Sequence, residues 1–174
     1  MKKTLIAIGT FAIVAIAAKF IGERAGTVSA VHSLQQEAAA QKMPTEFFGV
    51  KWLASLEDIK RLRPNIQQES PELFSERVTF MGRNAKITYY IKNNSTLMFI
   101  ITFSESATTE SFKATQTSLN NSYGAMSDIA SISDAQGPID CSHRTTERFR
   151  IDHCMRKLGS TIQEQIIFYR SNKS

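Results

Sequence analysis

Hydrophobic and polar residues alternate in two parts of the chain, and each part predicts a group of β-strands. The first group has runs rich in β-branched and aromatic residues at Val78–Met81, Ile87–Ile91 and Leu97–Phe103. Gly82-Arg83-Asn84 and Asn93-Asn94 separate these runs, and both are good turn sequences. The pattern therefore predicts a three-stranded antiparallel meander.

The second group lies at the end of the chain. It covers Ile139–Arg144, Phe149–Leu158 and Ile162–Arg170, with Gly159-Ser160 as the last turn. Between the two groups we expect Ala125–Pro138 to form a loose connection with at most a short turn of helix.

Two segments have apolar residues at helical spacing. From Thr109 to Tyr123 the spacing predicts a helix with a narrow apolar stripe, and Gly124 is placed as its C-terminal cap. A shorter helix begins at Ser55 and ends before Pro64, because the residue before a proline is pushed out of the helical region. The order helix, three strands, helix, three strands indicates an α+β fold with helices packed on one face of an antiparallel sheet.

The first residues follow a different pattern, in which Lys2 and Lys3 precede an almost unbroken apolar run from Leu5 to Ala18. This is typical of a cleavable signal peptide, with Ala15-Ile16-Ala17 as the cleavage site. An uncleaved membrane anchor is the alternative. As a helix, Thr4 to Ala18 rises only about 22 Å, short of a hydrocarbon core of about 30 Å.

Extending that helix to Gly22 nearly closes the gap, and Lys19 can then reach the headgroups. The polar, alanine-rich continuation as far as Pro44 favours this interpretation. We therefore expect a signal anchor or signal peptide over 1–22, a helical stalk or linker over 23–44, and a periplasmic α+β domain over 45–174. The expected location is the inner membrane, with a single pass, or the periplasm or exterior after cleavage.

Composition and charge indicate a globular domain and argue against one class of partner. The chain is 42% hydrophobic and 21% charged, with eleven phenylalanines, which is ordinary for a globular domain. The formal charge of +5 includes Lys2 and Lys3, so removing those two leaves +3 on the rest of the chain. The charges are interspersed and form no basic stripe, which argues against nucleic acid as a partner.

Cys141 and Cys154 are the only two cysteines. In an exported protein such a pair most simply forms a disulfide, here between strands of a hairpin that turns near Glu147-Arg148. With His143 and His153 the cysteines would also supply the ligand types of a zinc site. His153 and Cys154 are adjacent, however, so in a strand they project to opposite faces. We expect a disulfide flanked by two exposed histidines and no cofactor, with a metal or redox module as the alternative.

No catalytic, nucleotide-binding or metal-binding motif occurs in the sequence. We therefore expect a non-catalytic module that binds another protein of the cell envelope. A small envelope enzyme or ligand-binding protein with a cleft beside the sheet is the alternative, because distant carboxylates can meet in space. Phe47, Phe48 and Trp52 are candidate contacts for a partner, and packing in the core is the other explanation for them.

Three short segments support this expectation by resemblance. The run Phe48-Gly49-Val50-Lys51-Trp52, then Ser55-Leu56-Glu57-Asp58-Ile59, and later Leu119 to Gly124, resemble the small exported α+β modules of the SmpA/OmlA and β-lactamase-inhibitor-like kind. The resemblance implies helices on an antiparallel sheet and a non-enzymatic, protein-binding role. This chain departs from the pattern in having no lipobox cysteine and in having Leu53-Ala54 where a glycine turn is usual. No site residue follows from the resemblance.

Overall fold

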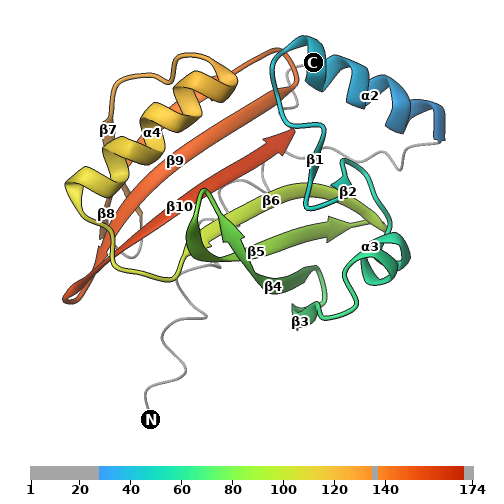
Figure 1. Ribbon diagram of the computed structural model, residues 1–174, viewed down its shortest axis with the longest axis horizontal. Helices are drawn as coiled ribbons and strands as arrows, with labels where there is room; N and C mark the ends of the chain where they lie inside the picture. The colour runs from blue at the N-terminus through green and yellow to red at the C-terminus, as the bar shows by residue number, and fades with distance from the viewer. Residues whose placement is uncertain (1–27, 135–136, 171–174) are drawn as a thin grey trace.

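The computed structural model describes residues 28–134 and 137–170, and this part of the chain forms a large antiparallel sheet with three helices (Figure 1). The helices are α2 (Val28–Ala40), α3 (Leu56–Leu62) and α4 (Thr109–Tyr123). The strands are β1 (Glu46–Phe47), β2 (Val50–Lys51), β3 (Gln67–Ser70), β4 (Leu73–Phe80), β5 (Arg83–Lys92), β6 (Ser95–Phe103), β7 (Ala130–Asp134), β8 (Gly137–Thr145), β9 (Phe149–Leu158) and β10 (Thr161–Arg170). The α+β prediction is confirmed.

Eight strands pair in the order β3-β4-β5-β6-β10-β9-β8-β7, and β1 and β2 form a separate hairpin. The predicted meander is present as β4, β5 and β6. Its second turn is Asn93-Asn94, as predicted, and both residues have positive φ. Its first turn is Met81-Gly82, one residue earlier than predicted. The last strand, β10, pairs with β6 and joins the two predicted groups into one sheet.

The prediction of a loose connection over Ala125–Pro138 is wrong in part, because β7 lies within it and pairs with β8. The segment has small and polar residues and only two isoleucines, so its strand depends on the neighbour β8 and not on a pattern of its own.

Helix α4 has the bounds predicted for it. Thr108 caps its start by accepting a hydrogen bond from the Ser111 amide at 3.1 Å, and the Ser111 hydroxyl accepts one from the Thr108 amide at 2.9 Å. Gly124 ends the helix with φ of 97°. Helix α3 begins after Ser55, whose side chain accepts from the Asp58 amide, and ends one residue before the Arg63-Pro64 pair.

Helix α2 packs on the domain and so belongs to it, although a stalk was expected over 23–44. Leu34, Ala38 and Met43 are buried in the same core as the sheet residues. The predicted anchor or signal segment, residues 1–22, lies outside the described residues. Among the helices of residues 28–134 and 137–170, none has the length and apolar character needed to cross a membrane.

The strands direct alternate residues to two faces of the sheet. The first face carries Phe99 and Phe168, which pack against Phe47 of the β1–β2 hairpin at ring distances of 4.3 and 4.5 Å. Helix α4 packs on this face too, alongside β9 and β10 (Figure 1). On the second face, Met98 and Ile167 are also buried. The centre of the sheet is therefore buried on both sides.

Candidate functional site

Two of the three residues predicted as partner contacts lie in the core. Trp52 is 1% exposed, its ring packs edge-on against Phe99 at 4.8 Å, and its Nε1–H donates to the Pro44 carbonyl at 2.7 Å. Phe47 lies against Phe99 and Phe168. These two rings therefore have almost no surface left for a partner.

Phe48 differs from its neighbours, because it is partly exposed at the tip of the β1–β2 hairpin. It has φ of 51° and is followed by Gly49 with φ of 83°, so the two-residue turn needs positive φ at both positions. Asparagine and glycine are the usual residues there, and a bulky side chain with positive φ is an outlier. An outlier of this kind is a reason to look for a function of the aromatic ring.

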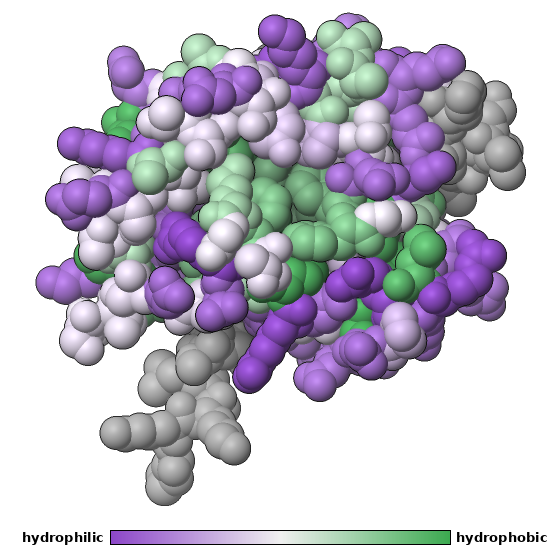
Figure 2. Space-filling model, in the orientation of Figure 1, coloured by the Kyte–Doolittle hydropathy of each residue, from purple (hydrophilic) through white to green (hydrophobic). Residues whose placement is uncertain are grey.

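The Phe48 ring contacts Phe80 of β4, and Val78, two residues earlier in the strand, is partly buried on the same face. The rings of Phe48 and Phe80 are 6.3 Å apart, and Phe80 continues to Phe103 of β6 at 6.4 Å. Figure 2 shows the face of the molecule that is turned toward the viewer in Figure 1. Apolar side chains are gathered in the middle of that face, with hydrophilic residues around them. We refer to Phe48, Val78 and Phe80 as the Phe48 patch.

Paired charges border the Phe48 patch. The Arg63 guanidinium lies 5.8 Å from the centre of the Phe48 ring and donates to both carboxylate oxygens of Glu76, at 2.6 and 2.9 Å. The Tyr89 hydroxyl donates to Glu76 at 2.9 Å. Burial raises the pKa of the Tyr89 phenol, and the Glu76 carboxylate raises it further. Glu76 is therefore held as an ion-paired acceptor and not as a free base.

A second ion pair lies beneath α4. Arg83 donates to Glu164 at 2.8 Å and to Thr115 of α4 at 3.2 Å, and its guanidinium stacks 3.8 Å above the Phe103 ring. Burial would raise the pKa of the Glu164 carboxyl, but hydrogen bonds with His153, Thr115 and Arg83 outweigh burial and hold the pKa below its ordinary value. Glu164 therefore remains a carboxylate in the interior.

His153 completes this cluster, and the prediction that it is exposed is wrong. Its side chain is fully buried, stacks on Phe112 at 3.9 Å, and places Nε2 2.9 Å from Glu164. In the strand, His153 alternates with Cys154, and its face is the one that α4 covers. Neither Arg83 nor Glu164 had a sequence signal, because the pair is 81 residues apart in the chain.

Ser142, His153 and Glu164 lie on three adjacent strands, in an order that invites comparison with a hydrolase triad. The Ser142 hydroxyl and His153 Nδ1 are both buried, and neither has a hydrogen-bond partner. A nucleophile must be within hydrogen-bond reach of its base and open to substrate. The three side chains meet neither condition, so the cluster is best explained as a structural one.

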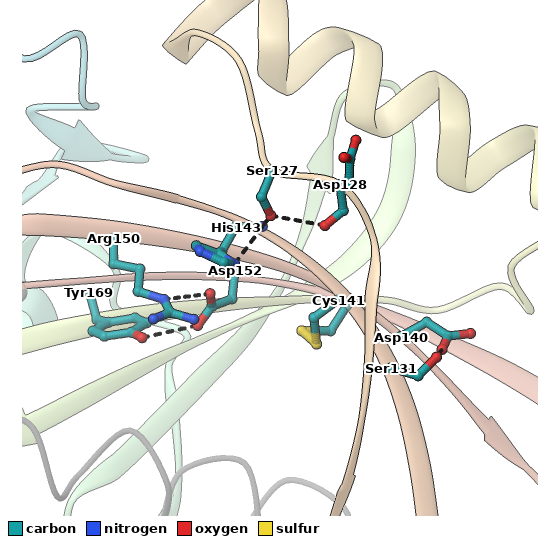
Figure 3. Close-up of a disulfide and its surroundings, with 10 residues drawn as sticks. Ser127, Asp128, Ser131, Asp140, Cys141, His143, Arg150, Asp152 and Tyr169 are labelled. Carbon is teal, nitrogen blue, oxygen red and sulfur yellow. Dashed lines mark hydrogen bonds and ion pairs between the residues drawn. A yellow bond between two sulfur atoms is a disulfide. The ribbon is translucent and has the colours of Figure 1, made fainter.

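Cys141 and Cys154 form a disulfide between directly paired residues of β8 and β9 (Figure 3). The predicted pairing is therefore confirmed in the structure. In Figure 3 Ser131 and Asp140 lie on one side of the bridge, and the Ser131 hydroxyl donates to Asp140. Asp152 lies on the other side.

Asp152 is held by Arg150 and Tyr169, as the dashed lines in Figure 3 show. Arg150 Nε donates to its carboxylate at 2.7 Å and the Tyr169 hydroxyl donates at 3.0 Å. Burial raises the pKa of the Tyr169 phenol, and Asp152 adds to that effect. Asp152 is therefore not available to orient a catalytic histidine.

His143, the residue paired with Asp152, lies with Nδ1 3.2 Å from the Ser127 hydroxyl. That hydroxyl donates to the Asp128 carbonyl at 3.0 Å and accepts from the His143 amide at 2.9 Å. Its proton is therefore directed to a backbone carbonyl and not to the imidazole. The arrangement fixes the entry to β7 and does not activate the serine.

No group of three or more histidine, cysteine, aspartate or glutamate residues in the described part of the chain is placed to hold a metal ion. The cysteines of the alternative zinc site are joined to each other. The resemblance to small exported modules stays a prediction, since comparisons of this chain with family models, with curated proteins and with solved structures found no match.

Proposed function

We propose that this chain is a non-catalytic protein-binding module of a bacterial-type cell envelope. Its N-terminal segment anchors it in the inner membrane, and its α+β domain faces the periplasm. If the segment is cleaved, the domain acts in the periplasm or outside the cell. The partner is another envelope protein.

The Phe48 patch carries the binding part of this proposal. Its partly exposed aromatic and aliphatic side chains have the ion pair Arg63–Glu76 at their border, and protein interfaces commonly combine an apolar centre with a polar rim. Phe48 also occupies a turn position that other residues fill at lower conformational cost.

Two observations support the location. The basic start and apolar run of the first residues are typical of export or anchoring. The disulfide between β8 and β9 is the form that two cysteines take in an oxidising compartment.

Photo-crosslinking in intact bacterial cells tests the proposal. A photoreactive residue replaces Val78 in the Phe48 patch, and a matched variant carries it at Thr117, which is exposed on helix α4. We expect a specific adduct from position 78 that is absent at position 117 and is found in the membrane fraction. The adduct is then identified by mass spectrometry.

Phe48→Asn separates binding from folding. The variant has an Asn-Gly turn, the strongest sequence for positive φ at both positions, which offsets part of the burial lost with the ring, so its free energy of unfolding should fall by at most about 2 kcal/mol. The adduct from position 78 should be lost. Retention of the adduct in this variant would exclude the Phe48 patch, and a cytosolic chain with its first residues intact would exclude the envelope location.

A further inference from the structure

The outer strand β7 leaves an unprotected edge of the sheet. Ile132 in this strand and Ile129 just before it are 51% and 49% exposed, and the small residues between and after them are exposed as well. Residues 129–133 contain no charge and no proline. Natural sheets usually protect an edge with charges, prolines or bulges, because unpaired backbone groups are a template for another strand.

The opposite edge, β3, has the protection that β7 lacks. It is four residues long, its register shifts between Gln68 and Ser70, and it carries Glu69, which pairs with Lys86 at 3.0 Å. Pro64 and Pro71 lie just outside the strand. The two edges of the sheet therefore differ in their protection against pairing with another strand, and β7 is the unprotected edge.

The position of the disulfide shows which backbone groups of β7 face outward. Cys141 and Cys154 are directly paired with their Cα atoms 4.2 Å apart, which is the spacing of a non-hydrogen-bonded pair. The N–H and C=O of Cys141 therefore point toward β7, where Ala130 is its partner. By alternation, the N–H and C=O of Ser131 and Ser133 point away from the sheet.

We propose that β7 binds an extended segment of another protein, which adds to the sheet as a further strand. Backbone groups of Ser131 and Ser133 would make the hydrogen bonds. The small side chains of Ala130, Ser131 and Ser133 leave room for large β-branched residues opposite them, and Ile129 and Ile132 supply apolar contact on the two faces. This surface is distinct from the Phe48 patch and goes beyond the proposed function.

The charges on either side of residues 129–133 indicate which charges the bound segment should have. Asp128 and Asp134 bracket the uncharged residues 129–133, so the bound segment should have an uncharged centre and lysine or arginine at its ends. A second copy of this chain fits less well, because the same segment of the copy has aspartate at both ends and contains no lysine or arginine.

Binding of a defined peptide to the full-length chain in detergent micelles tests the inference. The probe peptide alternates valine and threonine in its centre and has lysine at both ends. We expect it to slow amide hydrogen exchange at Ser131 and Ser133. A peptide with the same centre and glutamate ends should bind up to about fivefold more weakly, and one with a glycine-serine centre should give no protection.

Two substitutions at one position isolate the outward N–H. Ser131→Pro removes this N–H, whereas Ser131→Ala keeps it, and both remove the hydroxyl that donates to Asp140. We expect Ser131→Pro to weaken peptide binding by about tenfold relative to Ser131→Ala. Unchanged exchange rates in β6 and β10 would show that both variants remain folded.

Equal binding by the two variants, or no protection of Ser131 and Ser133 with any peptide, would overturn the inference. Protection that appears without peptide as the chain dimerises would also overturn it, in favour of a second copy. None of these results bears on crosslinking from position 78, so the strand-addition site and the Phe48 patch are tested separately.

Discussion

Glu164 holds together the polar contacts beneath α4, because it accepts hydrogen bonds from Arg83 and from His153 on two other strands. We expect Glu164→Gln to lower the free energy of unfolding by about 3 kcal/mol, since it leaves the Arg83 guanidinium without its counter-charge. The value is at the lower end for a buried pair because Arg83 keeps 20% of its side-chain surface in solvent. Urea denaturation measures the change.

Glu105→Gln is the matched control, since Glu105 is exposed in the loop before α4 and should change stability by less than about 0.5 kcal/mol. Equal effects of the two substitutions would show that the Arg83–Glu164 pair contributes nothing beyond a surface charge.

The same carboxylate predicts how stability depends on pH. The pKa of Glu164 is lower in the folded chain than its ordinary value of 4.5, so its contribution to stability is fully present above 4.5. The contribution is lost as the pH falls below 4.5 toward the folded-state pKa. Glu164→Gln should therefore flatten the acid side of the stability profile, measured by urea denaturation at a series of pH values. An identical profile in the two proteins would contradict this assignment.

For single residues, the sequence predicted features that depend on neighbouring residues in the chain. It did not predict contacts between residues that are far apart in the chain. Ser55 and Gly124 were identified because caps follow from local backbone chemistry. His153 was predicted to be exposed but is buried. The alternation of residues in a strand separates its two faces, but it does not show which face a helix will cover. The Arg83–Glu164 pair depends on the order of strands in the sheet.

At the scale of elements, α4 is the best defined by its own sequence, because its cap, its apolar stripe and its final glycine agree. We expect Thr108→Ala to lower the melting temperature, corresponding to about 1 kcal/mol, since it removes one of the two capping-box hydrogen bonds. Thr117→Ala is a matched control in the exposed middle of the same helix, where alanine is the better helix former. If Thr117→Ala lowers the melting temperature as much, the cap is not the cause.

The elements that the sequence did not reveal are short and depend on a partner. The β1–β2 hairpin has two residues in each strand, too few for an alternating pattern, and its Phe48 turn lacks the usual turn residue at the first position. Strand β7 has one isoleucine among small and polar residues, and it forms through pairing with β8. The exposed edge proposed as a binding site is thus a strand with a weak intrinsic preference.

At the scale of the whole molecule, the sheet is assembled by a contact that no local pattern encodes. Two groups of strands were expected, and the pairing of β10 with β6 makes them continuous, with residues such as Phe168 and Phe99 opposite each other. The β1–β2 hairpin then covers part of the first face, and Leu34 and Ala38 of α2 are buried in the same core. Strand order could not be predicted because sequence spacing carries no information about it.

The stability of the whole molecule depends on whether Cys141 and Cys154 are oxidised, and so on whether its compartment is oxidising or reducing. Cys141 and Cys154 are 13 positions apart, and closing a loop of this size should stabilise the fold by about 3 kcal/mol through the entropy of the unfolded chain. We expect the double variant Cys141→Ser, Cys154→Ser to lose about that amount in urea denaturation. The reduced wild-type protein should match the double variant, since both lack the bridge and keep the same sheet.

Alkylation of thiols in intact cells connects this result to location. If residues 1–22 deliver the domain to the periplasm, the wild-type chain should take up no alkylating reagent before reduction, because an oxidising compartment keeps Cys141 and Cys154 joined. A chain made without residues 1–22 should stay in the cytoplasm, react at both cysteines and show the lower stability of the double variant. Two reactive thiols in the full-length chain would contradict the periplasmic location while leaving the fold of the sheet unaffected.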